Sequence, residues 1–494
     1  MEIKIKNISV TEIKSDLLIV NLFEGTTLPG GATGAVDKEL SGLISDYVIK
    51  KEGFNGQFGK MYVLSVPNHK NITKVLIAGL GKRDDFNLNK LREICSKIIQ
   101  KVKTMDNVKN VVSMLHGAGC AGFEPEDCAR IIVEGTMIGG YSFDKYKSET
   151  KEAVKTFTVV EVDKTKFSKA EEGFSKGLLI GDTINYAKDL ITEPAEIITP
   201  AKLADIASNL DLDEVKIYEK KDIQNMQMGA FMAVSQGSIH SPRFIHMEYI
   251  PKKPKKKIVL IGKGITFDAG GLNLKPATSM MTMKNDMSGA AVVLSIMRNI
   301  KKLKPTAEIH ALIAACENMP SGSSYKQGDV VVAMNGKSIE IDNTDAEGRL
   351  TLADALCYAQ QLNPDVIIDI ATLTGACMVA LGSVASGILG NHDELIQKLI
   401  RCGKDGGERL WQMPMYPEYF ESLKSDIADM KNSGARGGGT TAATLFLKNF
   451  VKDGTPWAHI DIAGTAVIDK PILENPKGAT AVGVRTLLNY IMSE

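Results

Sequence analysis

The fold of this chain is decided by residues 257–300, which read KIVLIGKGITFDAGGLNLKPATSMMTMKNDMSGAAVVLSIMRNI. The opening KIVLIG is an apolar run typical of a strand buried on both faces, and SGAAVVLSIMRNI at 288–300 predicts a core helix. A buried strand followed by a helix is the repeating unit of an α/β sheet. Ligands bind beyond the carboxyl ends of such strands, so the glycine-rich connection between the two elements is a candidate site.

Four charged side chains, Lys263, Asp268, Lys275 and Asp286, stand in this connection with few other charges. Three of them have an ordinary structural interpretation. Lys263 follows the basic turn PKKPKKK at 251–257, where a solvated lysine is expected. Asp268 and Asp286 could cap helices, because Asp is a preferred N-cap residue. For Asp286, which stands just before the predicted helix, capping and metal binding can both hold.

A second acidic group lies in NTDAEGRL at 343–350. On an extended segment, side chains two residues apart point the same way, so Asp345 and Glu347 are expected to face one pocket, with Arg349 covering the space beyond them. The alternative is that Arg349 pairs with Glu347 as a local ion pair of little consequence.

Together these seven charged positions suit a pair of divalent cations. Carboxylates can bridge two metals roughly 3.5–4 Å apart, and such a pair polarises a carbonyl and activates a trapped water. None of the 7 histidines lies in HExxH spacing, which disfavours a mononuclear zinc protease. Oxygen ligands accept Zn, Mn, Co or Mg, largely according to availability. The residues therefore predict a two-metal hydrolase.

The rest of the C-terminal part alternates strand and helix patterns. A helix is expected through residues 352–359, and strands at 308–315, 330–336, 337–342, 366–374 and 458–463. Their apolar runs predict a mixed, mostly parallel sheet between helices. The glycine cluster SGARGGGT at 433–440 is typical of a mobile loop.

The N-terminal third predicts an α/β domain of its own. Strands are expected at 2–10, 15–23, 60–66, 74–81, 107–115 and 155–162, and helices from Leu88 to Val102 and over 126–141. GLGK at 79–82 lacks the spacing of a Walker motif, so no phosphate-binding role is expected for it. A long helix over 166–191, ended before Pro194, divides the chain into a domain at 1–165, a linker helix at 166–191 and a domain at 192–494.

Composition agrees with a two-domain cytoplasmic enzyme. The 494 residues exceed what one compact core usually holds. Lys plus Arg and Asp plus Glu each total 59, so the zero net charge gives no general attraction to nucleic acid or an anionic membrane. MEIKIKNISV at 1–10 lacks the apolar core of a signal peptide, so none is expected, and no stretch of about 20 apolar residues predicts a membrane span. Seven cysteines without CxxC spacing are expected to be reduced core residues: Cys95, Cys120, Cys128, Cys316, Cys357, Cys377 and Cys402.

The chain also resembles a known family. NTDAEGRL, GKGITFDAGG, ENMPSGSSYKQGDVV, DIATLTGA, SDIADMKN and WAHIDIAG match, in order, segments of the leucyl aminopeptidases. The resemblance is strong over residues 165–494 and thins before them. It implies a cytoplasmic metallo-exopeptidase that releases N-terminal residues, with leucine and other apolar residues favoured, by attack of a metal-bridging hydroxide. It also implies a macrodomain-like, non-catalytic N-terminal domain and a homohexamer.

The resemblance assigns metal ligands by position. Asp268 and Glu347 would bridge two divalent ions, Mn or Zn. Lys263 and Asp286 would complete one site, and Asp345 the other. Lys263 can ligate only as a neutral amine, and a nearby dication drives off its proton.

The resemblance also assigns catalytic and substrate-binding residues. Lys275 would contact the substrate carbonyl, and Arg349 would hold a bicarbonate ion that acts as general base. The S1 pocket would be lined by Met283, Thr372, Gly375 and Ala463. For Thr372 and Gly375 the alternative is ordinary packing at a strand end. Ala269 departs from the family, which often has serine there.

Two alternatives stay open from the residues. A two-metal hydrolase of another bond, such as a phosphoester, would prefer a more basic pocket. A catalytically inactive, nucleotide-binding module would not need to keep the full set of acidic ligands that this chain retains.

Overall fold

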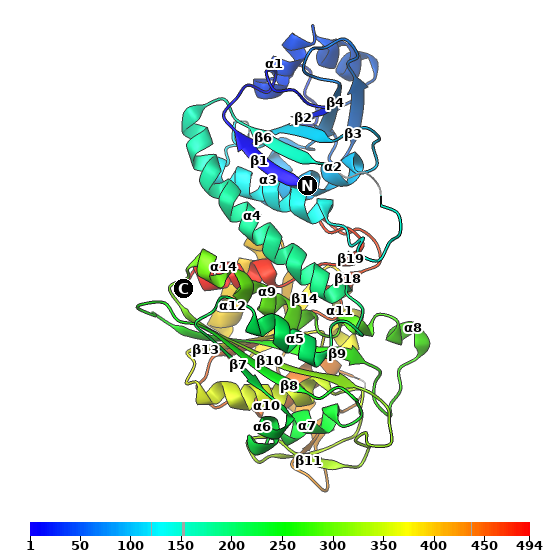
Figure 1. Cartoon of the computed structure of the whole chain (residues 1–494), viewed down its shortest axis with the longest axis vertical. Coiled ribbons are helices and arrows are strands. Elements are labelled where there is room, and N and C mark those ends of the chain that lie inside the picture. The colour runs from blue at the N-terminus through cyan, green and yellow to red at the C-terminus, as the bar shows by residue number, and fades with distance from the viewer. Residues whose placement is uncertain (120, 151–153, 436) are drawn as a thin grey trace. The chain divides into compact units, whose positions relative to one another are not determined.

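Figure 1 shows the computed structural model of the chain, which describes residues 1–119, 121–150, 154–435 and 437–494. The chain divides into two compact units. The first holds Met1–Asn185 and Pro471–Pro476, and the second holds Tyr186–Lys470 and Lys477–Glu494. The division falls within α4, Lys164–Thr192. This helix confirms the long helix predicted over 166–191. Cys120 and Arg436 of the glycine cluster lie outside the described residues.

The N-terminal unit contains a six-stranded sheet in the order β1-β6-β5-β2-β4-β3. Neighbouring strands run parallel except β3, which is antiparallel to β4. All six strands were expected from the sequence, and their observed bounds are Glu2–Lys6, Leu17–Leu22, Met61–Ser65, Lys74–Gly79, Asn110–Met114 and Thr156–Val160.

Helices cover both faces of this sheet. On one face, α2 (Leu88–Val102) and α3 (Pro125–Gly140) pack on Leu17 and Ile19 of β2. On the other, α1 (Gly31–Glu39) and the π-helix η1 (Leu43–Lys51) pack on Leu18 and Val20 of the same strand. The alternation of β2 between two cores explains its uninterrupted apolar sequence.

The second unit is built on an eight-stranded sheet in the order β15-β14-β17-β13-β9-β10-β8-β7. The four central strands are parallel, whereas β8, β7 and the β14–β17 pair introduce antiparallel neighbours. The predicted mixed, mostly parallel α/β fold is therefore confirmed. The strands, from β7 to β10 and then β13, β14, β15 and β17, are Glu214–Tyr218, Arg243–Tyr249, Lys257–Asp268, Glu308–Asn318, Val366–Ala371, Ser386–Gly390, Leu410–Gln412 and Trp457–Asp461.

Figure 1 shows helices on both sides of this sheet, with α5, α9 and α12 on one side and α6, α7 and α10 on the other. The first side is formed by α5 (Pro200–Ser208), α9 (Ser288–Leu303), α12 (Asp393–Gly406) and α14 (Val484–Met492). The second is formed by α6 (Lys220–Asn225), α7 (Gly229–Ser235), α10 (Gly348–Gln361) and α13 (Gly439–Lys448). The remaining short elements are α8 (Ala277–Met280), η3 (Met283–Asn285), α11 (Gly375–Leu381), η4 (Pro417–Leu423) and small sheets of β11 (Val330–Val332), β12 (Ser338–Glu340) and β16 (Met430–Lys431), and of β18 (Val467–Ile468) and β19 (Gly478–Ala479).

Two local expectations were wrong. The strand predicted over 257–262 continues as β9 to Asp268, so Lys263 and Asp268 lie on the strand and not in the following loop. Pairing with β10 continues along its length, with a register shift between Cys316 and Glu317, and this extends the strand past its glycines. The segment before α10 is a turn at 344–345 and not an extended segment.

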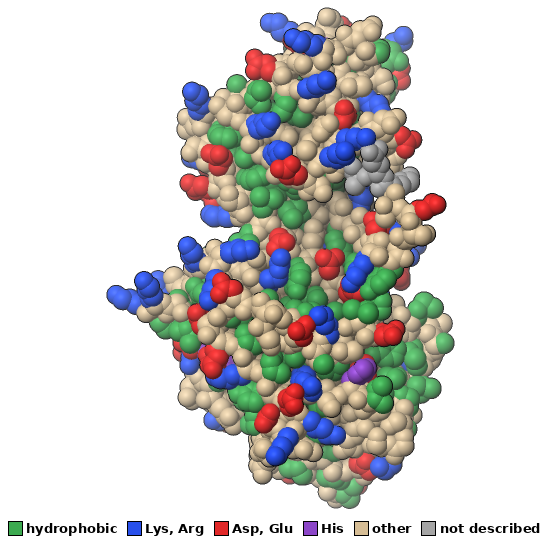
Figure 2. Space-filling model, viewed as in Figure 1, with side chains coloured by type: hydrophobic (Ala, Val, Ile, Leu, Met, Phe, Trp, Pro, Cys, Tyr) green, Lys and Arg blue, Asp and Glu red, His purple; other side chains and the backbone are tan. Residues whose placement is uncertain are grey.

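The remaining global expectations concern charge and cysteines. Figure 2 shows basic and acidic side chains interspersed over the face in view, as the balanced totals of 59 and 59 imply. Among the described helices, none has the length and apolarity needed to cross a membrane. The six cysteines within the described ranges are buried, as expected for core residues.

Candidate metal centre

The predicted ligands meet at the carboxyl ends of the central strands. Asp268 ends β9, and Lys263 lies five residues earlier on the same strand. Asp286 connects η3 to α9, while Glu347 is the N-cap residue of α10. Although the segment holding Asp345 and Glu347 is a turn, both side chains reach the cluster through the ion pairs described next.

Two lysines hold the four carboxylates in pairs. Lys263 Nζ lies 2.8 Å from Asp286 and 2.9 Å from Glu347. Lys275 Nζ lies 2.8 Å from Asp268 and 2.6 Å from Asp345. One carboxylate oxygen from each of Asp268, Asp286 and Glu347 lies within 4.8 Å of the others, and all three residues are buried. The cluster therefore contains more acidic than basic groups.

The pKa values reflect this crowding. Burial, and then the charge of Glu347, raises the pKa of Asp268 to about 6. Burial also raises the pKa of Asp286 well above its usual value. It raises the pKa of Asp345 as well. Burial opposes ionisation of Glu347 too, but Lys263 and Lys275 bring its pKa below the usual value. Repulsion among desolvated carboxylates is relieved by added positive charge, so the cluster favours bound cations.

An unpartnered oxygen supports the same conclusion. Glu347 Oε2 is buried and has no hydrogen-bond partner in the described ranges. A buried acceptor without a partner is costly, and a metal ion would satisfy it. The available donors are hard carboxylate oxygens and one amine, which suit Zn, Mn, Co or Mg. The residues therefore fit a divalent-cation site.

Lys263 is buried, and is not the solvated lysine that the basic turn before it suggests. Its side chain is 3% exposed, and its Nζ also donates to the Thr372 carbonyl at 3.0 Å. Gly348 makes this position possible, because a Cβ there would overlap the end of the Lys263 side chain. Burial works against the charge of Lys263, but Asp286 and Glu347 outweigh it and raise its pKa.

Two further alternatives from the sequence are not found. Asp286 does not cap α9, because Met287 is the N-cap residue of that helix and no side chain caps it. Over the described part of the chain Arg349 forms no ion pair with Glu347. Arg349 Nη1 donates instead to the Asn432 carbonyl at 2.8 Å, and its buried Nε has no hydrogen-bond partner in the described ranges. Burial lowers the pKa of Arg349 to about 10.

Neutral side chains that the sequence analysis missed hold the ligands in place. Asn318 ends β10 and donates to Asp268 Oδ1 at 2.8 Å and to the Thr344 carbonyl at 2.9 Å. Thr344 in turn donates to the Gly270 carbonyl at 2.7 Å. Ala269 donates its backbone N–H to the Asn318 carbonyl at 2.9 Å. Asn318 therefore links the turn before Glu347 to the end of β9.

The four predicted S1 residues lie on segments that border the carboxylates. Thr372 Oγ1 donates to Asp286 Oδ1 at 2.7 Å. Asp461, another residue the sequence analysis missed, accepts the backbone N–H of Leu373 at 3.2 Å and of Ala463 at 3.1 Å. Met283 begins η3, which leads to Asp286, and Gly375 begins α11. Their role in substrate binding stays a prediction.

Family models match both parts of the chain. The catalytic domain of the cytosol aminopeptidase family matches residues 185–488, and the N-terminal domain of that family matches residues 19–150. The carboxylate cluster lies wholly within the first match.

Relatives and solved structures agree with this match. A probable cytosol aminopeptidase of Persephonella marina is 44% identical over 93% of this chain and 93% of its own length. One of Aquifex aeolicus is 42% identical over 100% of this chain and 98% of its own. A mutant of tomato leucine aminopeptidase is 32% identical with a TM-score of 0.88, covering 100% of this chain and 97% of that one. The bottromycin maturation enzyme BotP in complex with Mn is 29% identical with a TM-score of 0.86, covering 97% and 99%. The chain belongs to the cytosol aminopeptidase family.

Proposed function

We propose that two divalent cations, Mn or Zn, are held by Lys263, Asp268, Asp286, Asp345 and Glu347. The protein is a metal-dependent aminopeptidase, a hydrolase that removes N-terminal residues from peptides. The observation that carries the proposal is a set of three buried carboxylates, with one oxygen of each within 4.8 Å of the others. Among the described residues, a second oxygen of Glu347 has no hydrogen-bond partner. The manganese complex of BotP supports Mn as one of the ions.

The five ligands divide between the two ions. Asp268 and Glu347 would bridge them, Lys263 and Asp286 would complete one site, and Asp345 would complete the other. When bound, the cations polarise the scissile carbonyl and lower the pKa of a water molecule. Lys263 donates a lone pair only as a neutral amine, so loading of its site releases a proton.

Lys275 and Arg349 act on the reacting groups. The Lys275 ammonium lies at the edge of the carboxylate cluster, where it can donate to the substrate carbonyl and to the oxyanion that forms from it. Arg349 would hold a bicarbonate ion as general base. Its buried Nε, which has no partner among the described residues, supports an anion at this position.

The free α-amine of a peptide would bind the metal-carboxylate cluster, which explains the release of terminal residues. Met283, Thr372, Gly375 and Ala463 would receive the first side chain. This small and mostly apolar set favours leucine and methionine. Cytoplasmic location and a homohexamer are proposed on family resemblance.

Metal reconstitution tests the proposal. The chelator-treated enzyme should be inactive, and Mn or Zn should restore release of p-nitroaniline from leucine p-nitroanilide. p-Nitrophenyl phosphate should be hydrolysed far more slowly, because the site has only two lysines and one arginine. Equal activity before and after chelation would contradict the metal assignment, and preference for the phosphate ester would favour the hydrolase of another bond.

A further inference from the structure

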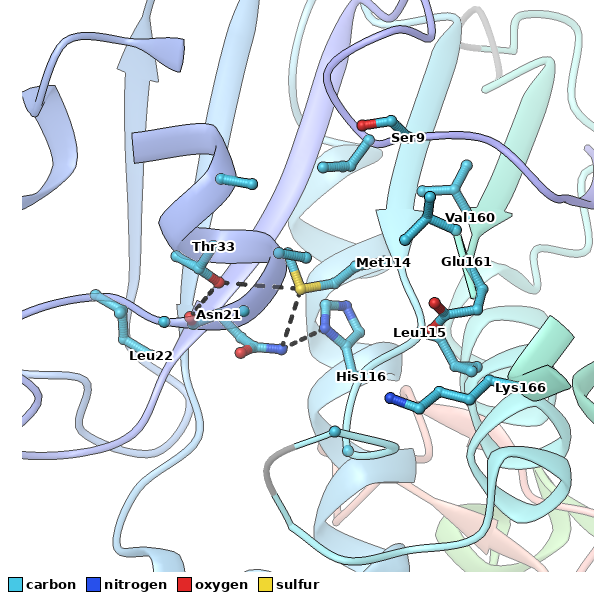
Figure 3. A pocket seen from close by; sticks show the side chains of 18 of the residues that line it. Ser9, Asn21, Leu22, Thr33, Met114, Leu115, His116, Val160, Glu161 and Lys166 are labelled. Atoms are coloured by element: carbon cyan, nitrogen blue, oxygen red, sulfur yellow. Dashed lines mark hydrogen bonds between the residues drawn. The ribbon is translucent and has the colours of Figure 1, made fainter. Parts of the chain in front are cut away.

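A cavity lies in the N-terminal unit, which contains none of the proposed metal ligands. Its volume is about 740 Å³. Figure 3 shows that it opens at the carboxyl ends of β2, β5 and β6, with Asn21 and Leu22 from β2, His116 after β5 and Glu161 after β6 around it. A cavity of this size accepts a ligand as large as a nucleotide.

The sheet topology makes this a favoured ligand position. From β2 the chain passes by α1 and η1 to β3 and β4 on one side of that strand, and then crosses to β5 on its other side. The helices α1 and η1, which connect β2 to β3, pack on one face of the sheet. The helices α2 and α3, which follow β4 and β5, pack on the opposite face. The gap between β2 and β5 is therefore a topological switch point, where open α/β sheets bind ligands.

The start of α1 presents bare backbone to the cavity. Gly30 is its N-cap residue, and no side chain caps the helix. A Cβ at Gly30 or Gly31 would meet nothing within 4 Å, and Gly31 has φ +56°, a conformation that disfavours other residues. The first amides of a helix lack intrahelical acceptors and favour an anion. Arg83 and Lys166 also line the cavity, and Figure 3 shows the Lys166 amine directed toward the loop after His116.

Asn21 supplies an independent sign of a ligand. It is 9% exposed, and its Nδ2 donates to Nδ1 of His116. His116 Nε2 is 2.8 Å from Ser113 Oγ, and burial lowers the pKa of His116 to about 4, so the neutral ring can accept from Asn21. This arrangement fixes the amide with Oδ1 as an acceptor, and Oδ1 has no partner over the described ranges of the chain. Asn21 itself lines the cavity.

We propose that this cavity binds a phosphorylated small molecule of nucleotide size. Its phosphate would lie against the amides at Gly30 and Gly31 and near Lys166, and an N–H or O–H group of the ligand would donate to Asn21 Oδ1. Apolar side chains suited to a flat ring complete the lining, including Ile8, Val10, Leu22, Leu115 and Val160. The acidic Glu161 in the lining already accepts the backbone N–H of Asp163 at 2.9 Å.

Calorimetric titration of the full metal-loaded enzyme tests this site. The probes are the four ribonucleoside monophosphates and diphosphates, with adenosine and inorganic phosphate as the separate halves of the ligand. At least one nucleotide should bind at micromolar to millimolar concentration and more tightly than either half. Failure of every nucleotide to bind at millimolar concentration would overturn the proposal, as would phosphate alone binding equally well.

Two variants assign the binding to this cavity and not to the catalytic metals. Gly30→Leu places a side chain in the open space before α1 and should abolish binding. Lys166→Gln should weaken it about tenfold. Lys169→Gln removes a lysine of the same helix that pairs with Glu124 instead, and should leave binding unchanged. All three should keep their thermal midpoint and their hydrolysis of leucine p-nitroanilide. Unchanged nucleotide affinity in both Gly30→Leu and Lys166→Gln would place the ligand elsewhere and contradict the proposal.

Discussion

Two groups of buried side chains of the kinds that bind metals lie in the second unit, and they differ in which of their polar atoms lack a partner in the described ranges. Asp268, Asp286 and Glu347 form one group, and His246, Glu248 and His310 form the other. Each could supply three ligand atoms to a metal by proximity alone. In the first group four carboxylates, counting Asp345, face two lysines, and an oxygen of Glu347 has no hydrogen-bond partner within the part of the chain that the structure describes.

The second group is satisfied without a metal. His246 Nε2 and His310 Nδ1 lie 2.8 Å apart and hydrogen bond to each other. The outer nitrogens of the two rings bond to Tyr358 at 3.1 Å and Glu308 at 2.8 Å, so all four ring nitrogens are in use. Glu248 accepts from Lys216 at 3.0 Å. Burial lowers the pKa of His246 to about 3, so its ring is neutral.

The comparison shows that closeness of potential ligand atoms is not enough to indicate a metal site. A buried cluster with unbalanced charge and an unused acceptor gains from binding a cation, whereas a cluster whose polar atoms are already paired must lose hydrogen bonds to do so. We therefore expect metals on the first group only, and the following variants test each side of that contrast.

Glu347→Gln should have the largest effect. Loss of one carboxylate charge from the proposed bridge should lower kcat for leucine p-nitroanilide on the order of a thousandfold or more, while circular dichroism stays unchanged. Asp342→Asn, which changes an exposed carboxylate of the same loop, is the matched control and should retain full activity. Normal turnover in Glu347→Gln would remove that residue from the metal site.

Arg349→Ala should lower turnover about a hundredfold without loss of metal, because Arg349 is proposed to hold the base and not an ion. Steady-state kinetics measures the turnover, and mass spectrometry of the same sample measures the metal content. A variant that has lost an ion would show that Arg349 supports the cations instead.

Asn318→Ala should act through metal affinity. Removal of the hydrogen bond to Asp268 frees that carboxylate to turn, so affinity should fall about 10- to 100-fold. Competition with a chelator of known affinity measures the change. Saturating Mn should restore most of the activity, and a variant that stays inactive in excess metal would argue for a different role.

His310→Gln should leave the metal content and the turnover close to those of the parent protein. It breaks the hydrogen bonds to His246 and Glu308, so the free energy of unfolding should fall by about 1–3 kcal/mol. Urea denaturation monitored by fluorescence gives this value. Loss of an ion from this variant would show that the histidine group does bind metal.

The sequence was sufficient for the elements with strong patterns. The amphipathic α2, the long α4 and the apolar β9 and β10 were all expected, because burial imposes a regular spacing on them. The helix α1 was missed, since its sequence GATGAVDKE has few of the apolar residues that mark a helix face. The extension of β9 depends on pairing with β10, which a local pattern does not contain.

The charged site residues were also found from sequence, because their clustering among glycines is unusual. The residues that support them were not. Asn318, Asn432 and Asp461 act through hydrogen bonds to segments far away along the chain. Such contacts depend on the tertiary fold and leave no periodic signal. Only the position of Asn318 and Asp461 at strand ends could have suggested their role.

Anomalous diffraction from a crystal grown with Mn or Zn tests the central claim most directly. The account predicts two peaks among Lys263, Asp268, Asp286, Asp345 and Glu347, and no peak between His246 and His310. A peak at the histidine pair, or the absence of any cation among the carboxylates, would contradict it.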